Sequence, residues 1–239
     1  MDIIKKLAQE LAIKEEQAKA AVQLIDEGNT IPFIARYRKE MTGALNDETL
    51  RNLHERLLYL RNLEEKKEQG INAITDQGKM TEDLKKKILS AETLVAVDDL
   101  YRPYRPKKQT RATKAKEKGL EPLANILLLQ KTTKSMEEEA AAFVNAEKGV
   151  ANAKEAIAGA KDIIAEMIAD MADYRKSIRN CTMKQGSLVV KAKDEKAESV
   201  YEMYYDFREP LSKVTGYRVL AINRGEKEKF LTVKVEAPD

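Results

Sequence analysis

Histidine and cysteine are the side chains that most often carry out nucleophilic or metal chemistry, and this sequence has one of each, His54 and Cys181. A zinc site needs three or four ligands drawn mainly from Cys and His. A Ser–His–Asp or Cys–His arrangement would have to use the same two residues, and nothing around either one resembles a nucleophile elbow. We therefore expect no metal site, no cofactor, no small-molecule substrate and no catalytic residue.

A phosphate-binding loop is also excluded by spacing. Gly70 and Gly78 precede Lys79, but seven residues separate the two glycines. The P-loop has four residues between its glycines and a Ser or Thr after its lysine, where this chain has Met80. The two glycines are therefore interpreted as helix-end residues.

Basic residues concentrate in the segment from Tyr101 to Lys118, where Glu117 is the only acid. Tyr101 and Tyr104 lie among these cations. Lys and Arg neutralise phosphates, and exposed aromatic rings stack on unpaired bases. The alternative is a solvated loop that its prolines keep extended and whose tyrosines pack down. The nucleic-acid-binding candidates are Arg102, Arg105, Lys107, Lys108, Arg111 and Lys114, with Tyr101 and Tyr104 for stacking.

A second, weaker cluster consists of Arg36, Arg38 and Lys39, directly after the apolar residues Phe33 and Ile34. A cation near the end of a short helix is favoured by the helix dipole. The cluster is therefore a candidate phosphate contact, but a ligand is not needed to explain it.

Composition favours a mainly α-helical protein, because Ala, Leu, Lys and Glu dominate and Gly and Pro are sparse. The net charge of +3 over 239 residues means that any nucleic-acid surface must come from local clusters. A single cysteine cannot form an intrachain disulfide, and the sequence has neither a signal-peptide pattern nor an apolar run of membrane-spanning length. We expect a cytoplasmic protein without membrane contact.

Periodicity and capping residues predict the elements. A long helix should begin at Asn46 or Asp47, become more solvated around Glu64 and Lys67, and weaken or break near Gly70. The two Arg-Pro steps at 102–106 predict an extended path. Further helices are expected at 3–11, 18–25, 31–36, 81–89, from 110, from 121, from 135, at 152–177 and at 217–225, and one or two short strands at 187–193 and 230–237.

Four stretches resemble one known family. They are "TIPFIARYRKEMTGAL", "LHERLLYLRNLEEKKE", "DLYRPYRPKKQTRATKAKEKGLEPLA" and "RVLAINRGEKEKFLTVKV", in that order between Thr30 and Val235. Together they are similar to the N-terminal region of the Tex family of bacterial transcription accessory proteins. The resemblance implies a helical region with a helix-turn-helix element, nucleic-acid binding (RNA, DNA or both), an association with transcription and no known catalysis. It also implies that the family's ribonuclease-H-like, helix-hairpin-helix and C-terminal OB-type RNA-binding domains are not in this chain.

Two functions stay open at this point. The first is a nucleic-acid-binding module of an elongated, mainly α-helical fold with a small strand-containing segment near its C-terminus. The second is a scaffold that contacts RNA polymerase, other transcription machinery or further domains, with little nucleic-acid binding of its own. The predicted organisation is a helical domain at 1–130, a long-helix strut at 131–185 and a small α/β segment at 186–239.

Overall fold

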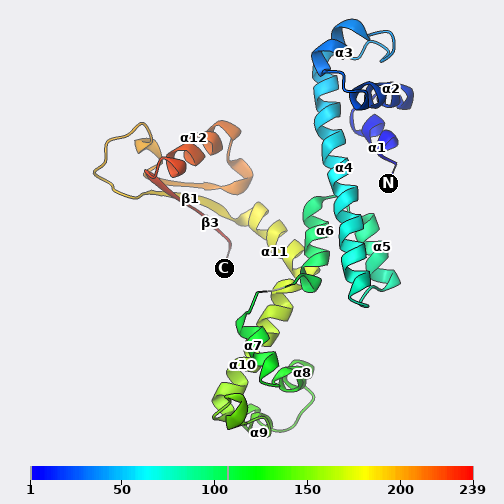
Figure 1. The fold of residues 1–239 in the computed structure, drawn as a ribbon. Helices are drawn as coiled ribbons and strands as arrows, with labels where there is room; N and C mark the ends of the chain where they lie inside the picture. The colour runs from blue at the N-terminus through cyan, green and yellow to red at the C-terminus, as the bar shows by residue number, and fades with distance from the viewer. Residues whose placement is uncertain (1, 107, 239) are drawn as a thin grey trace. The chain divides into compact units, whose positions relative to one another are not determined.

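The computed structural model describes residues 2–106 and 108–238. The chain divides into two compact units, Met1–Lys107 and Lys108–Asp239, and each is considered by itself (Figure 1). The fold is mainly α-helical with one small sheet near the C-terminus, which confirms the predicted class. In the part of the chain that is described, no helix has the length and apolarity that a membrane span requires.

The regular structure of residues 2–106 is entirely helical. Its elements are α1 (Ile3–Glu10), α2 (Glu15–Asp26), α3 (Ile31–Tyr37), α4 (Asp47–Asp76), α5 (Glu82–Ser90), α6 (Leu94–Tyr101) and the 3₁₀-helix η1 (Arg102–Tyr104).

The long helix α4 is the support on which this unit is built. The Asn46 side chain accepts a hydrogen bond from the Thr49 amide and so satisfies one of the free N–H groups at the helix start. Leucines at a 3–4 spacing form one buried stripe along α4, and α1, α2, α3, α5 and α6 all pack against this helix. The stripe consists of Leu50, Leu53, Leu57, Leu60 and Leu63.

The predicted solvated middle and break of α4 are wrong. The helix is continuous through Gly70, and Lys67 is only 3% exposed. The Lys67 ammonium donates to Glu64 Oε1 and to the Leu89 carbonyl of α5, both at 2.9 Å, so its polar head is satisfied inside the packed interface. Gly70 is buried beneath Tyr101 of α6, and a Cβ added there would lie 4.0 Å from the Tyr101 side chain, an ordinary contact distance.

The expected extended path at 102–106 is wrong for its first half. Arg102 has φ −51° and ψ −43°, and Arg102–Tyr104 continues α6 as a 3₁₀ turn. Pro103 needs no amide donor at the start of such a turn, so it is accommodated there. The chain becomes extended only at Arg105, with φ −64° and ψ 140°.

The second unit combines helices with the sheet. Its elements are α7 (Arg111–Glu117), α8 (Glu121–Leu129), α9 (Met136–Ala141), η2 (Ala146–Lys148), α10 (Ala153–Asp170), α11 (Ala172–Gln185), β1 (Ser187–Ala192), η3 (Glu202–Tyr204), β2 (Asp206–Pro210), η4 (Leu211–Lys213), α12 (Gly216–Lys227) and β3 (Leu231–Glu236).

Side-chain caps begin three of the α-helices in this unit, α7, α9 and α10. Ser135 and Glu138 form a capping box at α9, and Thr110 caps α7. Helices α7, α8 and α9 pack against α10 over a core that includes Leu120 and Ile163. The single helix expected at 152–177 is instead two helices, because Met171 takes an extended conformation with ψ 119° between α10 and α11.

The sheet has three antiparallel strands in the order β2-β1-β3. The strands β1 and β3 and the helix α12 between them lie where they are expected. The strand β2 was not predicted, because four of its five residues are charged or proline and only Phe207 marks its inner side. Its inner face and those of the other strands join α12 in a small core that contains Val190, Ile222 and Leu231.

Candidate nucleic-acid interface

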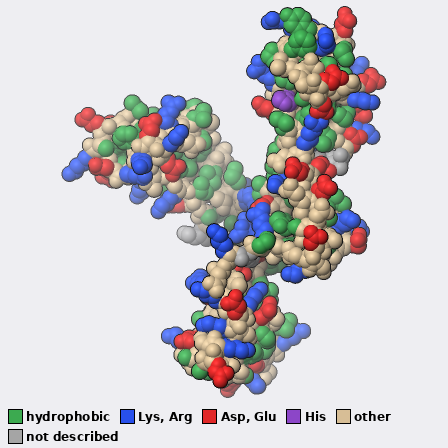
Figure 2. Space-filling view, in the orientation of Figure 1, with side chains coloured by type: hydrophobic (Ala, Val, Ile, Leu, Met, Phe, Trp, Pro, Cys, Tyr) green, Lys and Arg blue, Asp and Glu red, His purple; other side chains and the backbone are tan. Residues whose placement is uncertain are grey.

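The loop that follows α3 forms an open groove with three of the predicted cations. Its volume is about 600 Å³. Arg36, Arg38 and Lys39 line it together with two acids, Glu27 and Glu40. We call this feature the α3 groove; its full lining is Leu24, Glu27, Arg36, Tyr37, Arg38, Lys39, Glu40 and Met41. Figure 2 shows blue, red and green side chains close together over α3, at the top of the view.

Local hydrogen bonds hold the backbone of this loop. Thr42 is fully buried, and its hydroxyl lies 3.3 Å from the carbonyls of Arg38 and Lys39. Gln17 of α2 donates from Nε2 to the carbonyls of Thr42 and Gly43 at 3.3 and 2.9 Å. Gly43 has φ +60°, a conformation that a glycine adopts without steric cost. The cations are therefore presented by a braced turn.

Aromatic rings order the cationic side chains of the groove. The Phe33 and Tyr37 rings lie 5.2 Å apart at 47°. The Arg38 guanidinium lies 5.1 Å from the centre of the Phe33 ring, and that of Arg36 lies 5.9 Å from the Tyr37 ring. None of Arg36, Arg38 and Lys39 forms a salt bridge with any residue that the structure describes. Their charges are thus available to an anionic ligand.

The structure divides the other predicted cluster between the two units. Tyr101 and Tyr104 are half-buried and pack against the core of the first unit. Arg105 pairs with Asp98 and lies 5.4 Å from the Tyr101 ring centre. These contacts match the alternative in which the tyrosines pack down, and their stacking on bases stays a prediction. Arg102 is half-buried in the 3₁₀ turn.

The remaining residues of that cluster fall in or near the second unit. Lys107 lies outside the described residues, and Lys108 is exposed at the start of the unit. Arg111, Lys114 and Lys118 line a smaller groove of about 250 Å³ on α7, which we call the α7 groove. Its charge is partly offset, because Arg111 lies 3.6 Å from Asp162.

Tyr37 is the groove residue that sequence reasoning missed. It is 60% exposed, whereas Tyr101 and Tyr104 are half-buried. The sequence did contain the same pattern of a tyrosine next to arginines, because Tyr37 stands between Arg36 and Arg38 as Tyr101 precedes Arg102. What the sequence did not reveal was which tyrosines the core covers.

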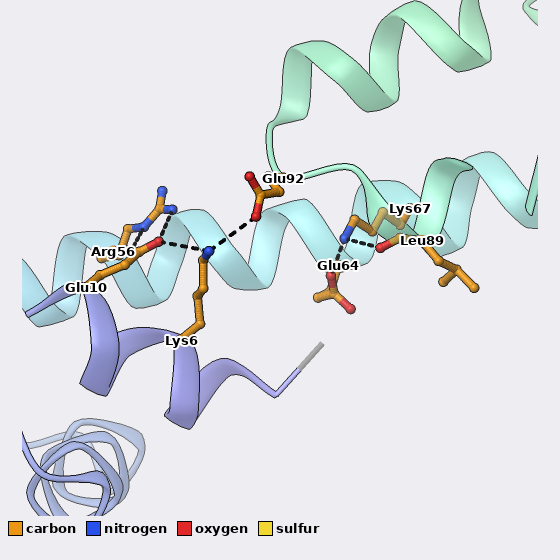
Figure 3. A network of polar contacts seen from close by, with 7 residues as sticks. All are labelled: Lys6, Glu10, Arg56, Glu64, Lys67, Leu89 and Glu92. Atoms are coloured by element: carbon orange, nitrogen blue, oxygen red, sulfur yellow. Dashed lines mark hydrogen bonds and ion pairs between the residues drawn. The ribbon is translucent and has the colours of Figure 1, made fainter. Parts of the chain in front are cut away.

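A network of ion pairs and hydrogen bonds within the first unit has a structural role (Figure 3). Arg56 of α4 donates to both carboxylate oxygens of Glu10 at 2.5 and 2.9 Å, and Lys6 lies 3.4 Å from Glu92. The hydrogen bond from Arg56 lowers the pKa of Glu10 below its ordinary value. The Arg56–Glu10 pair ties α1 to α4, and the Lys6–Glu92 pair ties α1 to the connection between α5 and α6. The charges of these four side chains are therefore already paired.

The structure places His54 and Cys181, the two residues first considered for chemistry, on different helices. His54 is half-buried on α4, and Cys181 is exposed on α11. Among residues 2–106 and 108–238, no group of three or more His, Cys, Asp or Glu side chains is arranged to hold a metal ion.

Comparison with known families accounts for most of the chain. Residues 1–75 match the model described as "Tex-like protein N-terminal domain", and residues 131–239 match "Tex central region-like". The chain belongs to the Tex family. The α3 groove lies inside the first match, and α7 lies between the two matches.

Relatives in the Tex family are similar along almost the whole chain. Protein YhgF of Escherichia coli is 45% identical over 97% of this chain, and the transcriptional accessory protein Tex of Neisseria gonorrhoeae is 40% identical over 99%. The human S1 RNA-binding domain-containing protein 1 is 33% identical over the full chain. The chain covers 30%, 31% and 24% of these three relatives, so it spans about a third or less of their length.

Proposed function

We propose that this chain is a nucleic-acid-binding, non-catalytic region of a cytoplasmic transcription accessory protein. The Neisseria gonorrhoeae relative is named as a transcriptional accessory protein, and the human relative is named for an S1 RNA-binding domain. These names support the class of process, and the α3 groove supplies the local chemistry. The helix-turn-helix element that the family resemblance implies remains part of this proposal.

The observation that carries the proposal is that the three cations of the α3 groove have no salt-bridge partner among the described residues. Arg36, Arg38 and Lys39 are consecutive or nearly so, and no described carboxylate forms a salt bridge with them. Cations in this arrangement bind backbone phosphates, which positions a nucleic acid without reading its sequence. Binding should therefore be weakly sequence-specific and strongly dependent on salt.

The decisive test is neutralisation of the groove with a charge-matched control. The test variant carries Arg36→Gln, Arg38→Gln and Lys39→Gln. The control, Lys79→Gln, Lys85→Gln and Lys86→Gln, removes the same charge from exposed lysines of the same unit. Fluorescence anisotropy with a labelled oligonucleotide should show weaker binding for the groove variant only.

The salt dependence gives the expected size of the effect. For a single strand, the logarithm of the binding constant falls with the logarithm of salt by about 0.7 per neutralised phosphate. Loss of three contacts should therefore make this slope shallower by about 2. An equal loss in both variants would mean that only overall charge matters and that the groove is not a site.

The α7 groove is the second binding candidate within the same function. Substitution of Arg111, Lys114 and Lys118 by Gln tests it in the same assay. The sequence-based candidates Arg102, Arg105 and Lys108 form the third set, and neutralising them should have a smaller effect where existing ion pairs hold the side chain, as Asp98 holds Arg105.

A scaffold is the alternative function, and one observation favours it. The second half of α10 and all of α11 expose large apolar side chains, which is typical of a surface that contacts another protein. These residues are Met167, Ile168, Met171, Tyr174, Ile178 and Met183. If the parent chain shows no measurable binding of single- or double-stranded nucleic acid at low salt, the scaffold replaces the binding module.

A further inference from the structure

The position of Tyr37 in the α3 groove adds a second kind of contact to the phosphate-binding cations. Tyr37 is the last residue of α3, and its side chain is 60% exposed. Phe33, one helical turn earlier, packs near the ring at a centroid distance of 5.2 Å and is itself half-buried. Tyr37 therefore has an aromatic neighbour on its own helix, while its side chain remains mostly exposed.

Basic residues flank Tyr37 in the sequence, with Arg36 before it and Arg38 after it. The Arg36 guanidinium lies 5.9 Å from the ring centre, and Arg38 donates from Nη1 to the Tyr37 carbonyl at 3.2 Å. Lys39 follows in the same turn and lines the same groove. An exposed ring with cations on both sides in sequence matches a nucleotide, which combines a flat base with a charged phosphate.

Charge alone makes the groove a modest anion site. Glu27 and Glu40 line it beside the three cations, so its formal charge from these five residues is +1. Both strands of a duplex would bring phosphates toward these carboxylates, while the bases would stay stacked on one another and out of reach of Tyr37. A single strand can place one base on the ring and its neighbouring phosphates on the cations.

We propose that the α3 groove binds single-stranded nucleic acid, with one unpaired base stacked on Tyr37 and the flanking phosphates contacted by Arg36, Arg38 and Lys39. This inference rests on the proposed nucleic-acid-binding function and adds the ligand's strandedness and the stacking residue. The hydroxyl of Tyr37 has no role in it, because the ring face makes the contact.

The test compares substitutions at Tyr37 that keep or remove the ring. Tyr37→Phe keeps the stacking face, and Tyr37→Leu removes it. Tyr217→Leu is the matched control, since Tyr217 is 65% exposed and has the Arg218 guanidinium 5.7 Å from its ring centre, but does not line the α3 groove. All are made in the full chain and measured by anisotropy against short single-stranded RNA, single-stranded DNA and a DNA duplex.

Stacking on one aromatic side chain is worth roughly a 5- to 150-fold change in affinity. Tyr37→Leu should lose that much affinity for the single strands, whereas Tyr37→Phe and Tyr217→Leu should bind like the parent. Duplex binding should be the same for all four proteins. If the leucine variant at Tyr37 binds single strands as the parent does, stacking is overturned, although neutralisation of the cations can still support the proposed function.

A second measurement on the parent chain removes any dependence on the folding of the variants. Irradiation with an oligonucleotide that contains 5-iodouracil links the base to an aromatic side chain in contact with it. Mass spectrometry should locate the link at Tyr37. A link at other tyrosines without one at Tyr37 would contradict the proposal even if every variant bound nucleic acid.

Discussion

Gly159 lies in the middle of α10, where alanine would normally be the better helix residue. Replacement of a helical glycine by alanine stabilises a helix by about 0.5–1 kcal/mol. Here, however, an added Cβ would stand 2.4 Å from Leu120 Cδ1 and 3.3 Å from Ala115 Cβ. Ordinary carbon contacts are about 3.5–4.0 Å, so the first of these distances is far too short.

Because the residues around Gly159 are buried, we expect Gly159→Ala to destabilise the protein. Leu120 is fully buried in the core of the second unit, and Ala115 has no rotatable side chain with which to move aside. Overpacking of this kind costs about 1–3 kcal/mol. After subtraction of the gain in helix propensity, Gly159→Ala should destabilise the second unit by about 1 kcal/mol.

Gly70→Ala is the matched control in the first unit. Gly70 also lies inside a long helix and is buried, but an added Cβ would meet Tyr101 at 4.0 Å, an ordinary contact. This variant should gain about 0.5–1 kcal/mol. Hydrogen exchange under native conditions, followed peptide by peptide, reports the two units separately.

The expected result is faster exchange in residues 111–170 of Gly159→Ala and slower exchange in residues 47–101 of Gly70→Ala. Equal stabilisation by both substitutions would refute the described packing of α7 and α8 against α10, because Leu120 would then have room to move.

Three further predictions concern the first unit. Lys67→Ala should cost about 1–3 kcal/mol in urea denaturation because it leaves the Leu89 carbonyl without its donor, whereas Lys66→Ala, at an exposed position, should change stability little; equal effects would contradict the buried role of Lys67. The hydrogen bond from Arg56 is the main reason why the pKa of the Glu10 carboxyl lies below its ordinary value of 4.5, so the stability that this ion pair adds is present above pH 4.5 and is lost as the pH falls through the lower folded-state pKa. Glu10→Gln should therefore flatten the loss of thermal stability in that acid range. A pH profile that Glu10→Gln leaves unchanged would contradict the Arg56–Glu10 pair. Gly43→Ala should lower stability by about 1–2 kcal/mol, since its φ of +60° is strained for alanine, and a variant as stable as the parent would show that the α3 groove loop is not held in this conformation.

Local signals in the sequence predicted most of the helix starts. Asn46 and Ser135 are recognisable as helix starts because short polar side chains at those positions satisfy free amides within the same few residues, and a helix start is also predicted at Thr110. Such signals need no knowledge of the rest of the fold. The two longer strands were also predictable from their alternating, β-branched residues.

The errors arose where contacts distant in sequence decide the outcome. Lys67 looked like a solvated residue, but the Leu89 carbonyl and Glu64 satisfy it in an interface between helices. The strand β2 forms because β1 offers a pairing edge, although its own residues, apart from Phe207, are poor strand formers. The candidate site shows the same division: charge clusters were visible in the sequence, but the exposure of Tyr37 was not.

The most direct test of the central claim is an NMR titration of the full ¹⁵N-labelled chain with a short single-stranded oligonucleotide at low salt. Binding in the α3 groove predicts that the amide signals of residues 36–41 shift first and furthest, with Tyr37 among them. Shifts confined to α7 or to the exposed apolar side of α11, or no shifts at all, would contradict the account.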